Sequence, residues 1–105
     1  MKFCALSLAG LMLLSGCASS ASINEQMSSW QGSRITEVVN SWGPPTSTFT
    51  DVDGSLWYTW KQESFNQYGS LEANRTFKVE NGRVTTYRWN GQNGIVMGWT
   101  NIGKQ

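Results

Sequence analysis

A helix stop at Gly43-Pro44-Pro45 is the feature that most constrains the fold of this chain. Glycine readily takes the left-handed conformation that ends a helix, and proline cannot continue one. In residues 33–42, just before the stop, apolar side chains recur at the spacing of one helix face, and Ser33 is a suitable N-cap. The apolar positions are Ile35, Val38, Val39 and Trp42. We therefore predict a helix over 33–42 that ends at Gly43.

The residues after the prolines have the composition of β-strands. Residues 46–50 are rich in β-branched side chains, and residues 55–61 alternate and are strongly aromatic. The segment 51–54 between them has the Asp and Gly residues of a turn. Residues 62–74 are polar and include Gly69, so we predict a loop there.

An Asn81-Gly82 pair separates two further alternating runs, 75–80 and 83–89. Asn-Gly between such runs is a strong signal of a hairpin with a two-residue turn. The pairs that this turn would bring together are Glu80 with Arg83 and Val79 with Val84. The second half of the chain is therefore predicted to be an antiparallel meander.

The order of these elements indicates an α+β domain with two layers. An apolar helix stripe must be buried against one face of a sheet, so we expect short N-terminal helices to pack on one face of a small antiparallel meander. A second short helix is expected at 23–30 and a short strand at 95–97. We expect one domain over 23–100, followed by a tail at 101–105.

The first residues have the pattern of an export signal. Lys2 supplies a positive charge, and residues 4–14 form an apolar run that is too short to span a bilayer. The next residues, Leu14-Ser15-Gly16-Cys17, look like a lipobox, the processing signal of bacterial lipoproteins.

This resemblance implies that residues 1–16 are a signal peptide cleaved before Cys17. It also implies that Cys17 carries diacylglycerol on its sulfur and a further acyl chain on its amine, which together anchor a protein stably to a membrane. Ala18 in place of Asp favours the outer membrane by resemblance to the sorting rule of such lipoproteins. Residues 17–22 would be a flexible tether.

The charge and residue content of the remaining chain narrow its function. Removing residues 1–16 takes away one of eight basic residues and leaves seven basic against seven acidic residues. A chain without a basic run is not expected to bind nucleic acid. The chain has no His, and an acylated Cys17 would leave no free thiol, so the usual catalytic bases and nucleophiles are missing.

We therefore expect no enzymatic activity, no metal and no cofactor. The candidate acids are Asp51, Asp53, Glu63, Glu72 and Glu80, and no cleft is evident for a domain of this size. Asp51-x-Asp53-Gly54 matches only a fragment of a calcium loop, since Phe49 and Trp60 stand where further ligands are needed.

The helix and its stop resemble the signature of the BamE (SmpA/OmlA) lipoproteins. The matching pattern is Gly32-x-x-x-x-Glu37-Val38-x-x-x-Trp42-Gly43-x-Pro45, followed by an aromatic strand at 56–60 and a hairpin at 77–84. The chain is also similar to envelope lipoproteins with a W-G-P-P motif. The resemblance implies a small α+β fold and, for BamE itself, a role in the outer-membrane β-barrel assembly machine. Arg34 departs from the Thr that often begins the family's helix.

Alternation along the strands gives a candidate binding surface. Leu56, Tyr58 and Trp60 share one strand face, which we expect to pack on the helix, while Trp57 takes the other. A regular two-residue hairpin would place Tyr87 and Trp89 on the same open side as Trp57, and exposed aromatic patches often mark binding sites. Alternatively, other segments cover these aromatic residues as a second small core. A bulge in the hairpin would reverse the faces of Tyr87 and Trp89.

These observations predict a lipid-anchored lipoprotein on the periplasmic face of the outer membrane. We expect a non-catalytic binding or scaffolding role in outer-membrane assembly or integrity, with another envelope protein as partner. The alternative is a glycan or phospholipid binder at the peptidoglycan–outer-membrane boundary, using Trp57, Tyr87 and Trp89.

Overall fold

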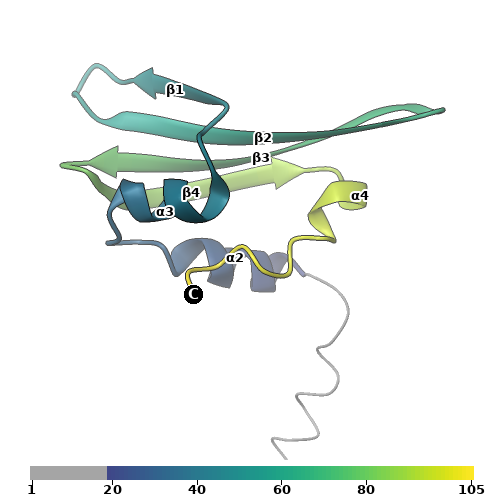
Figure 1. Ribbon diagram of the computed structural model, residues 1–105, viewed down its shortest axis with the longest axis horizontal. Coiled ribbons are helices and arrows are strands. Elements are labelled where there is room, and N and C mark those ends of the chain that lie inside the picture. Colours follow the sequence, from purple (N-terminus) through teal and green to yellow (C-terminus); the bar gives the residue numbers. More distant parts are fainter. Residues whose placement is uncertain (1–18) are drawn as a thin grey trace, which may run out of the picture.

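The computed structural model describes residues 19–105 of the chain. The elements in this part are α2 (Ser20–Ser28), α3 (Ile35–Trp42), β1 (Ser47–Thr50), β2 (Leu56–Asn66), β3 (Gly69–Glu80), β4 (Arg83–Gly91) and α4 (Asn93–Val96), as labelled in Figure 1. The predicted signal peptide at 1–16 and the acylated Cys17 lie outside the described residues. Within residues 19–105, no helix has the length and hydropathy needed to cross a membrane.

The four strands form one antiparallel sheet in the order β1-β2-β3-β4, so the predicted α+β fold with a meander is confirmed. The helices and the C-terminal residues cover one face of the sheet, which we call the core face, and leave the other as the open face. The Asn81-Gly82 turn is also confirmed, with positive φ angles of 54° and 78° and with Glu80 opposite Arg83. The buried core consists of Ile23, Met27, Trp30, Val38, Trp60, Ala73, Phe77, Val84, Ile95, Val96, Trp99 and Ile102.

Helix α3 ends at Gly43 as predicted, but it begins later than predicted. Gly43 has a φ of 88° and a ψ of −178°, a conformation open almost only to glycine, and it ends the helix there. At the other end the N-cap is Arg34, and Ser33 is not the cap. The backbone carbonyl of Ser33 instead accepts a hydrogen bond of 2.9 Å from the amide of Val84 in β4. Pairing with the edge of the sheet therefore holds Ser33 outside the helix.

The predicted loop at 62–74 is wrong, because β2 and β3 continue through it as one long hairpin. The pairing runs from Leu56–Val79 to Asn66–Gly69, and the end of the hairpin projects beyond the rest of the sheet (Figure 1). Strand β1 pairs only with Leu56–Thr59, so the outer half of β2 extends past it. Residues 61–70 are exposed, so this half shows no alternation of apolar and polar residues, which is the signal that sequence analysis requires.

The predicted strand at 95–97 is also wrong, because Asn93–Val96 form the short helix α4. Ile95 and Val96 are both buried in the core, whereas neighbouring residues of a strand would point to opposite faces. At the start of the domain, α2 begins at Ser20 and includes three residues of the predicted tether at 17–22.

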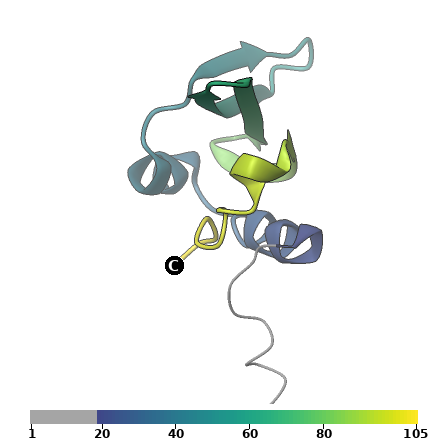
Figure 2. The ribbon, with the colours of Figure 1, turned by 90° about the vertical axis from the view of Figure 1, so that its right-hand side faces the viewer.

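The predicted tail at 101–105 is part of the domain. Figure 2 shows the C-terminal segment passing between α2 and α3. The carbonyl oxygen of Ile102 accepts hydrogen bonds from the indole nitrogens of Trp30, at 2.8 Å, and Trp42, at 3.2 Å. Gln26 in α2 accepts from the Ile102 amide at 2.8 Å and donates to the Trp99 carbonyl at 3.0 Å. The C-terminal segment therefore links the two longer helices.

Substitution of Gln26 by Ala should destabilise the fold, because the side chain makes two hydrogen bonds to the C-terminal segment. We expect the free energy of unfolding in urea to fall by about 1–3 kcal/mol, since each such bond contributes about 0.5–1.5 kcal/mol. The control is Gln31→Ala, which removes one bond at an exposed site, from Gln31 to the Thr85 carbonyl. Equal losses for the two variants would contradict this role of Gln26.

The ion pair between Glu37 in α3 and Lys104 should make stability depend on acid pH. The Lys104 ammonium lies 3.1 Å from a carboxylate oxygen of Glu37, and its hydrogen bond and charge lower the pKa of Glu37. A carboxyl whose pKa is lowered by folding stabilises the protein above its unfolded pKa, and the contribution is lost as pH falls.

Urea midpoints of the wild type and of Glu37→Gln should therefore differ at about pH 7, and the difference should shrink as the pH falls through the lowered pKa of folded Glu37. Glu25→Gln is the matched control, because Glu25 makes no ion pair within residues 19–105. A midpoint difference for Glu37→Gln that stays constant with pH would show that the ion pair contributes nothing.

Candidate binding site on the open face of the sheet

The prediction that Trp57, Tyr87 and Trp89 share one face is wrong. The pairing of β3 with β4 shifts between Val79, opposite Val84, and Lys78, opposite Thr86. This β-bulge reverses the faces of the following β4 residues, as the alternative reading of the hairpin required. Tyr87 and Trp89 therefore pack on the core, and only Trp57 lies on the open face.

Trp89 lies on the core face of the sheet, where it stabilises the fold. Its indole nitrogen donates a hydrogen bond of 2.8 Å to the side-chain oxygen of Asn24 in α2. Its ring meets that of Trp99 edge to face, with centroids 5.9 Å apart. These contacts tie β4 to α2 and to the C-terminal segment, so Trp89 helps to close the core.

Around Trp57, five residues line an open depression of about 340 Å³, which we call the Trp57 surface. It is formed by Phe49, Asp51, Trp57, Thr59 and Arg88. Phe49 lies directly opposite Trp57 in the β1–β2 pairing, and its side chain is 63% exposed. An exposed apolar ring beside a half-buried tryptophan is typical of a contact surface.

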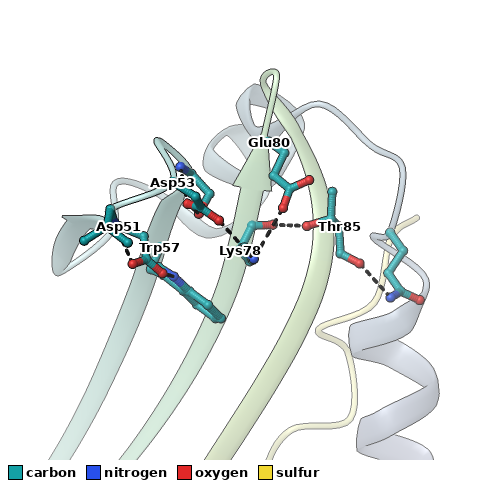
Figure 3. Close-up of polar contacts among 9 residues, drawn as sticks. Asp51, Asp53, Trp57, Lys78, Glu80 and Thr85 are labelled. Atoms are coloured by element: carbon teal, nitrogen blue, oxygen red, sulfur yellow. Dashed lines mark hydrogen bonds and ion pairs between the residues drawn. The ribbon is translucent and has the colours of Figure 1, made fainter.

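The Trp57 ring is held in place by a carboxylate and two cations. Its indole nitrogen donates to a carboxylate oxygen of Asp51 at 3.2 Å, as Figure 3 shows. The guanidinium carbon of Arg88 lies 4.7 Å from the ring centroid, and the ammonium of Lys78 lies 5.7 Å from it. Cations at these distances are attracted to the face of the ring, so the ring orientation is fixed before any ligand binds.

The two cations differ in their charge partners. Lys78 lies 3.8 Å from Asp53 and 3.4 Å from Glu80, so two carboxylates neutralise it (Figure 3). Hydrogen bonds from the Ser55 hydroxyl and amide, with the charge of Lys78, lower the pKa of Asp53, which keeps it ionised. Arg88 makes no ion pair within the described part of the chain. Arg88 is therefore a cation of the Trp57 surface that stacks on the ring without an ion pair, on the same surface as the carboxylate of Asp51.

Sequence analysis did not identify Phe49 and Arg88 as site residues. Phe49 could have been found, because a short turn between 46–50 and 55–61 brings it close to Trp57. Arg88 could not, since its face depends on the bulge in β4.

The five candidate acids are held in turns and ion pairs. Glu63 and Glu72 lie opposite each other in the long hairpin, and their carboxylates lie 3.5 and 3.7 Å from the Lys61 ammonium. Asp51 and Asp53 accept hydrogen bonds from the amides of Val52 and Ser55 in the turn. Glu80 forms an ion pair with Lys78. Residues 19–105 contain no group of three or more His, Cys, Asp and Glu that could hold a metal ion.

A second arginine, Arg75, lies on the core face and was also missed. Its guanidinium carbon lies 4.2 Å from the ring centroid of Trp42 and 5.0 Å from that of Trp99. Desolvation by burial lowers its pKa to about 10, so it remains charged at neutral pH. Alternation placed Arg75 in phase with Phe77 and Val79, which was the signal that it faces inward.

Comparison with protein-family models, with characterised proteins and with solved structures gives no match to this chain. The likeness to the BamE lipoproteins therefore remains a resemblance of motifs.

Replacing Arg75 or Arg88 by lysine should change the stability of the protein by different amounts. Lysine keeps the charge but loses the planar group that stacks on indole. Arg75→Lys should lower the free energy of unfolding by about 1–2 kcal/mol, because a desolvated cation–π contact is worth about 2 kcal/mol against about 0.5–1 for an exposed one. Arg88→Lys should lower the free energy of unfolding by less than about 1 kcal/mol, and unfolding in urea measures both variants. A larger loss for Arg88→Lys would contradict the assignment of the two faces.

Proposed function

We propose that this protein is a lipid-anchored lipoprotein of the outer membrane whose role is to bind another envelope protein, without catalysis. The anchor is Cys17, on the basis of the apolar run at 4–14 and the lipobox-like residues 14–17. The binding site is the Trp57 surface. The observation that carries the proposal is that this surface combines the exposed Phe49 ring with an exposed arginine, Arg88, which makes no ion pair within the described residues.

These features favour a protein partner with an apolar side chain next to a carboxylate. Phe49 provides an apolar contact, and Arg88 matches a carboxylate by its planar pair of donors. Aromatic residues and arginine contribute most of the binding free energy at many protein interfaces. A role in outer-membrane assembly or integrity, as the resemblance to BamE implies, is consistent with such a partner.

The glycan alternative has less support than the protein partner. It required Trp57, Tyr87 and Trp89 on one face, and two of these residues pack on the core. A sugar ring that stacked on Trp57 would compete with the Arg88 guanidinium, which already lies 4.7 Å from the ring centroid.

Two experiments in cells test the proposal. In the first, a clickable fatty acid should label the wild-type protein but not Cys17→Ser. In the second, a photo-crosslinking amino acid at position 49 should capture a partner in the envelope, whereas the same probe at the fully exposed Val52 should not.

Arg88→Glu should reduce the crosslink at position 49 by roughly tenfold or more, because disrupting a close charge pair at an interface costs about 2–5 kcal/mol. The matched control is Arg34→Glu, since Arg34 is exposed at the start of α3 and outside the Trp57 surface. Unlabelled wild-type protein would refute the lipid anchor. A crosslink that survives Arg88→Glu would refute the binding site.

A further inference from the structure

Three segments without charged residues come together at one end of the domain. They are residues 19–24, 64–71 and 90–98, which contain no Asp, Glu, Lys or Arg, and we call them the uncharged end. In Figure 1 the tip of the β2–β3 hairpin and α4 lie at the right-hand end, and α2 begins below them, at its end nearer that side. The ion pairs of Lys78 with Asp53 and Glu80 lie at the other end of the hairpin, beside the turns. Lys61, Glu63 and Glu72 form ion pairs further along the hairpin. In this part of the hairpin, only residues 64–71, which lie beyond them at the tip, are free of charge.

Direct contacts hold these segments together. The Gln92 amide donates to the Glu72 carbonyl at 3.2 Å, and the Gln92 side chain accepts from the Glu72 amide at 2.7 Å. Gly94 lies so close to the hairpin that a Cβ at this position would come within 2.6 Å of a methyl carbon of Leu71. The asparagine side chain of α2, Asn24, accepts from Trp89. Helix α4 therefore packs against the outer half of the hairpin, and α2 is bonded to β4, the strand that leads into α4.

Large apolar side chains are exposed at the uncharged end. Phe65 is 74% exposed, Tyr68 in the hairpin turn 88%, and Met97 at the end of α4 51%. They are three of the five large apolar side chains exposed in residues 19–105. A surface that combines exposed aromatic residues with an absence of charge suits the boundary between lipid headgroups and acyl chains, where charged groups are costly.

The same end carries the start of the folded domain. In the sequence, Cys17 is only two residues before Ser19, the N-cap of α2. Acyl chains on Cys17 would thus hold the start of α2 close to the lipid. The lipid leaflet to which the chain is attached would thus lie next to the uncharged end, where a partner protein would have to compete with it for the same surface.

We propose that the uncharged end lies against the lipid leaflet, with Phe65 and Tyr68 of the hairpin tip in the headgroup region. This inference rests on the proposed anchor at Cys17. Contact at the tip and at the anchor would fix the orientation of the domain. The Trp57 surface, near the other end of β2, would then face away from the membrane and towards a partner.

A fluorescent probe at the hairpin tip tests this orientation. After processing and acylation, a cysteine introduced by Gln67→Cys would be the only free thiol, and it can carry an environment-sensitive dye. Full-length protein made in cells is reconstituted in vesicles of phosphatidylethanolamine and phosphatidylglycerol, with nitroxide-labelled lipid as quencher. We expect a blue shift, a several-fold rise in emission and quenching by the nitroxide. The matched control is Val52→Cys, at the opposite end of β2, which should show none of these changes.

The outcomes separate this inference from the proposed anchor. Protein that floats with the vesicles but shows the same unquenched emission at positions 67 and 52 would overturn the orientation and leave the anchor intact. Protein that does not float would overturn both. In the Gln67→Cys background, the pair Phe65→Ser and Tyr68→Ser should lose the quenching without loss of flotation. Quenching that persists in this variant would show that the two aromatic side chains do not hold the tip in the lipid.

Discussion

The Ile102 carbonyl, which accepts hydrogen bonds from two indoles, is the contact on which the closure of the domain depends. Trp30 follows α2 and Trp42 ends α3, so one backbone oxygen joins both helices to the C-terminal segment. Trp42 in turn packs on two aromatic residues of the sheet, with ring centroids 5.1 Å from Trp60 and 5.2 Å from Phe77. Residues 19–105 contain no cysteine, and a domain of this size without disulfides gains little stability from an ordinary core. Large aromatic side chains bury more apolar area per residue. In this domain, Trp30, Trp60 and Phe77 all contact Trp42.

Such a core is stable only if its polar atoms find partners, because a buried donor without an acceptor costs about 1–3 kcal/mol. All six tryptophans of the chain donate their indole N–H. The acceptors are the Ile102 carbonyl for Trp30 and Trp42, Asp51 for Trp57, the Gly43 carbonyl for Trp60, Asn24 for Trp89 and Gln62 for Trp99. Gly43 thus has two roles, since it ends α3 and accepts from the sheet. Most of these bonds join residues far apart in the sequence, so they fix the tertiary arrangement.

Local signals in the sequence were sufficient for part of the fold. The stop at Gly43 and the Asn81-Gly82 turn depend on the conformations of a few neighbouring residues, and the structure has both. The long hairpin was missed because its outer half is exposed on both faces, so backbone pairing holds it without an apolar pattern. The burial of Ile102 depends on indoles about sixty residues or more away. The candidate site was only partly predictable, because one extra residue in β4 exchanges the two faces for Tyr87 and Trp89.

Because strand β1 is short, the sheet has two parts that differ in how firmly they are held. Where β1 pairs with Leu56–Thr59, β2 lies between two neighbours and over the indole core. Beyond it, β2 has a strand on one side only within the described residues, and residues 61–66 are exposed. Local opening requires least free energy where few buried contacts oppose it. The outer part of the hairpin is therefore more flexible than the part that packs on the core. It can adjust to the shape of a membrane surface while the Trp57 surface keeps its conformation.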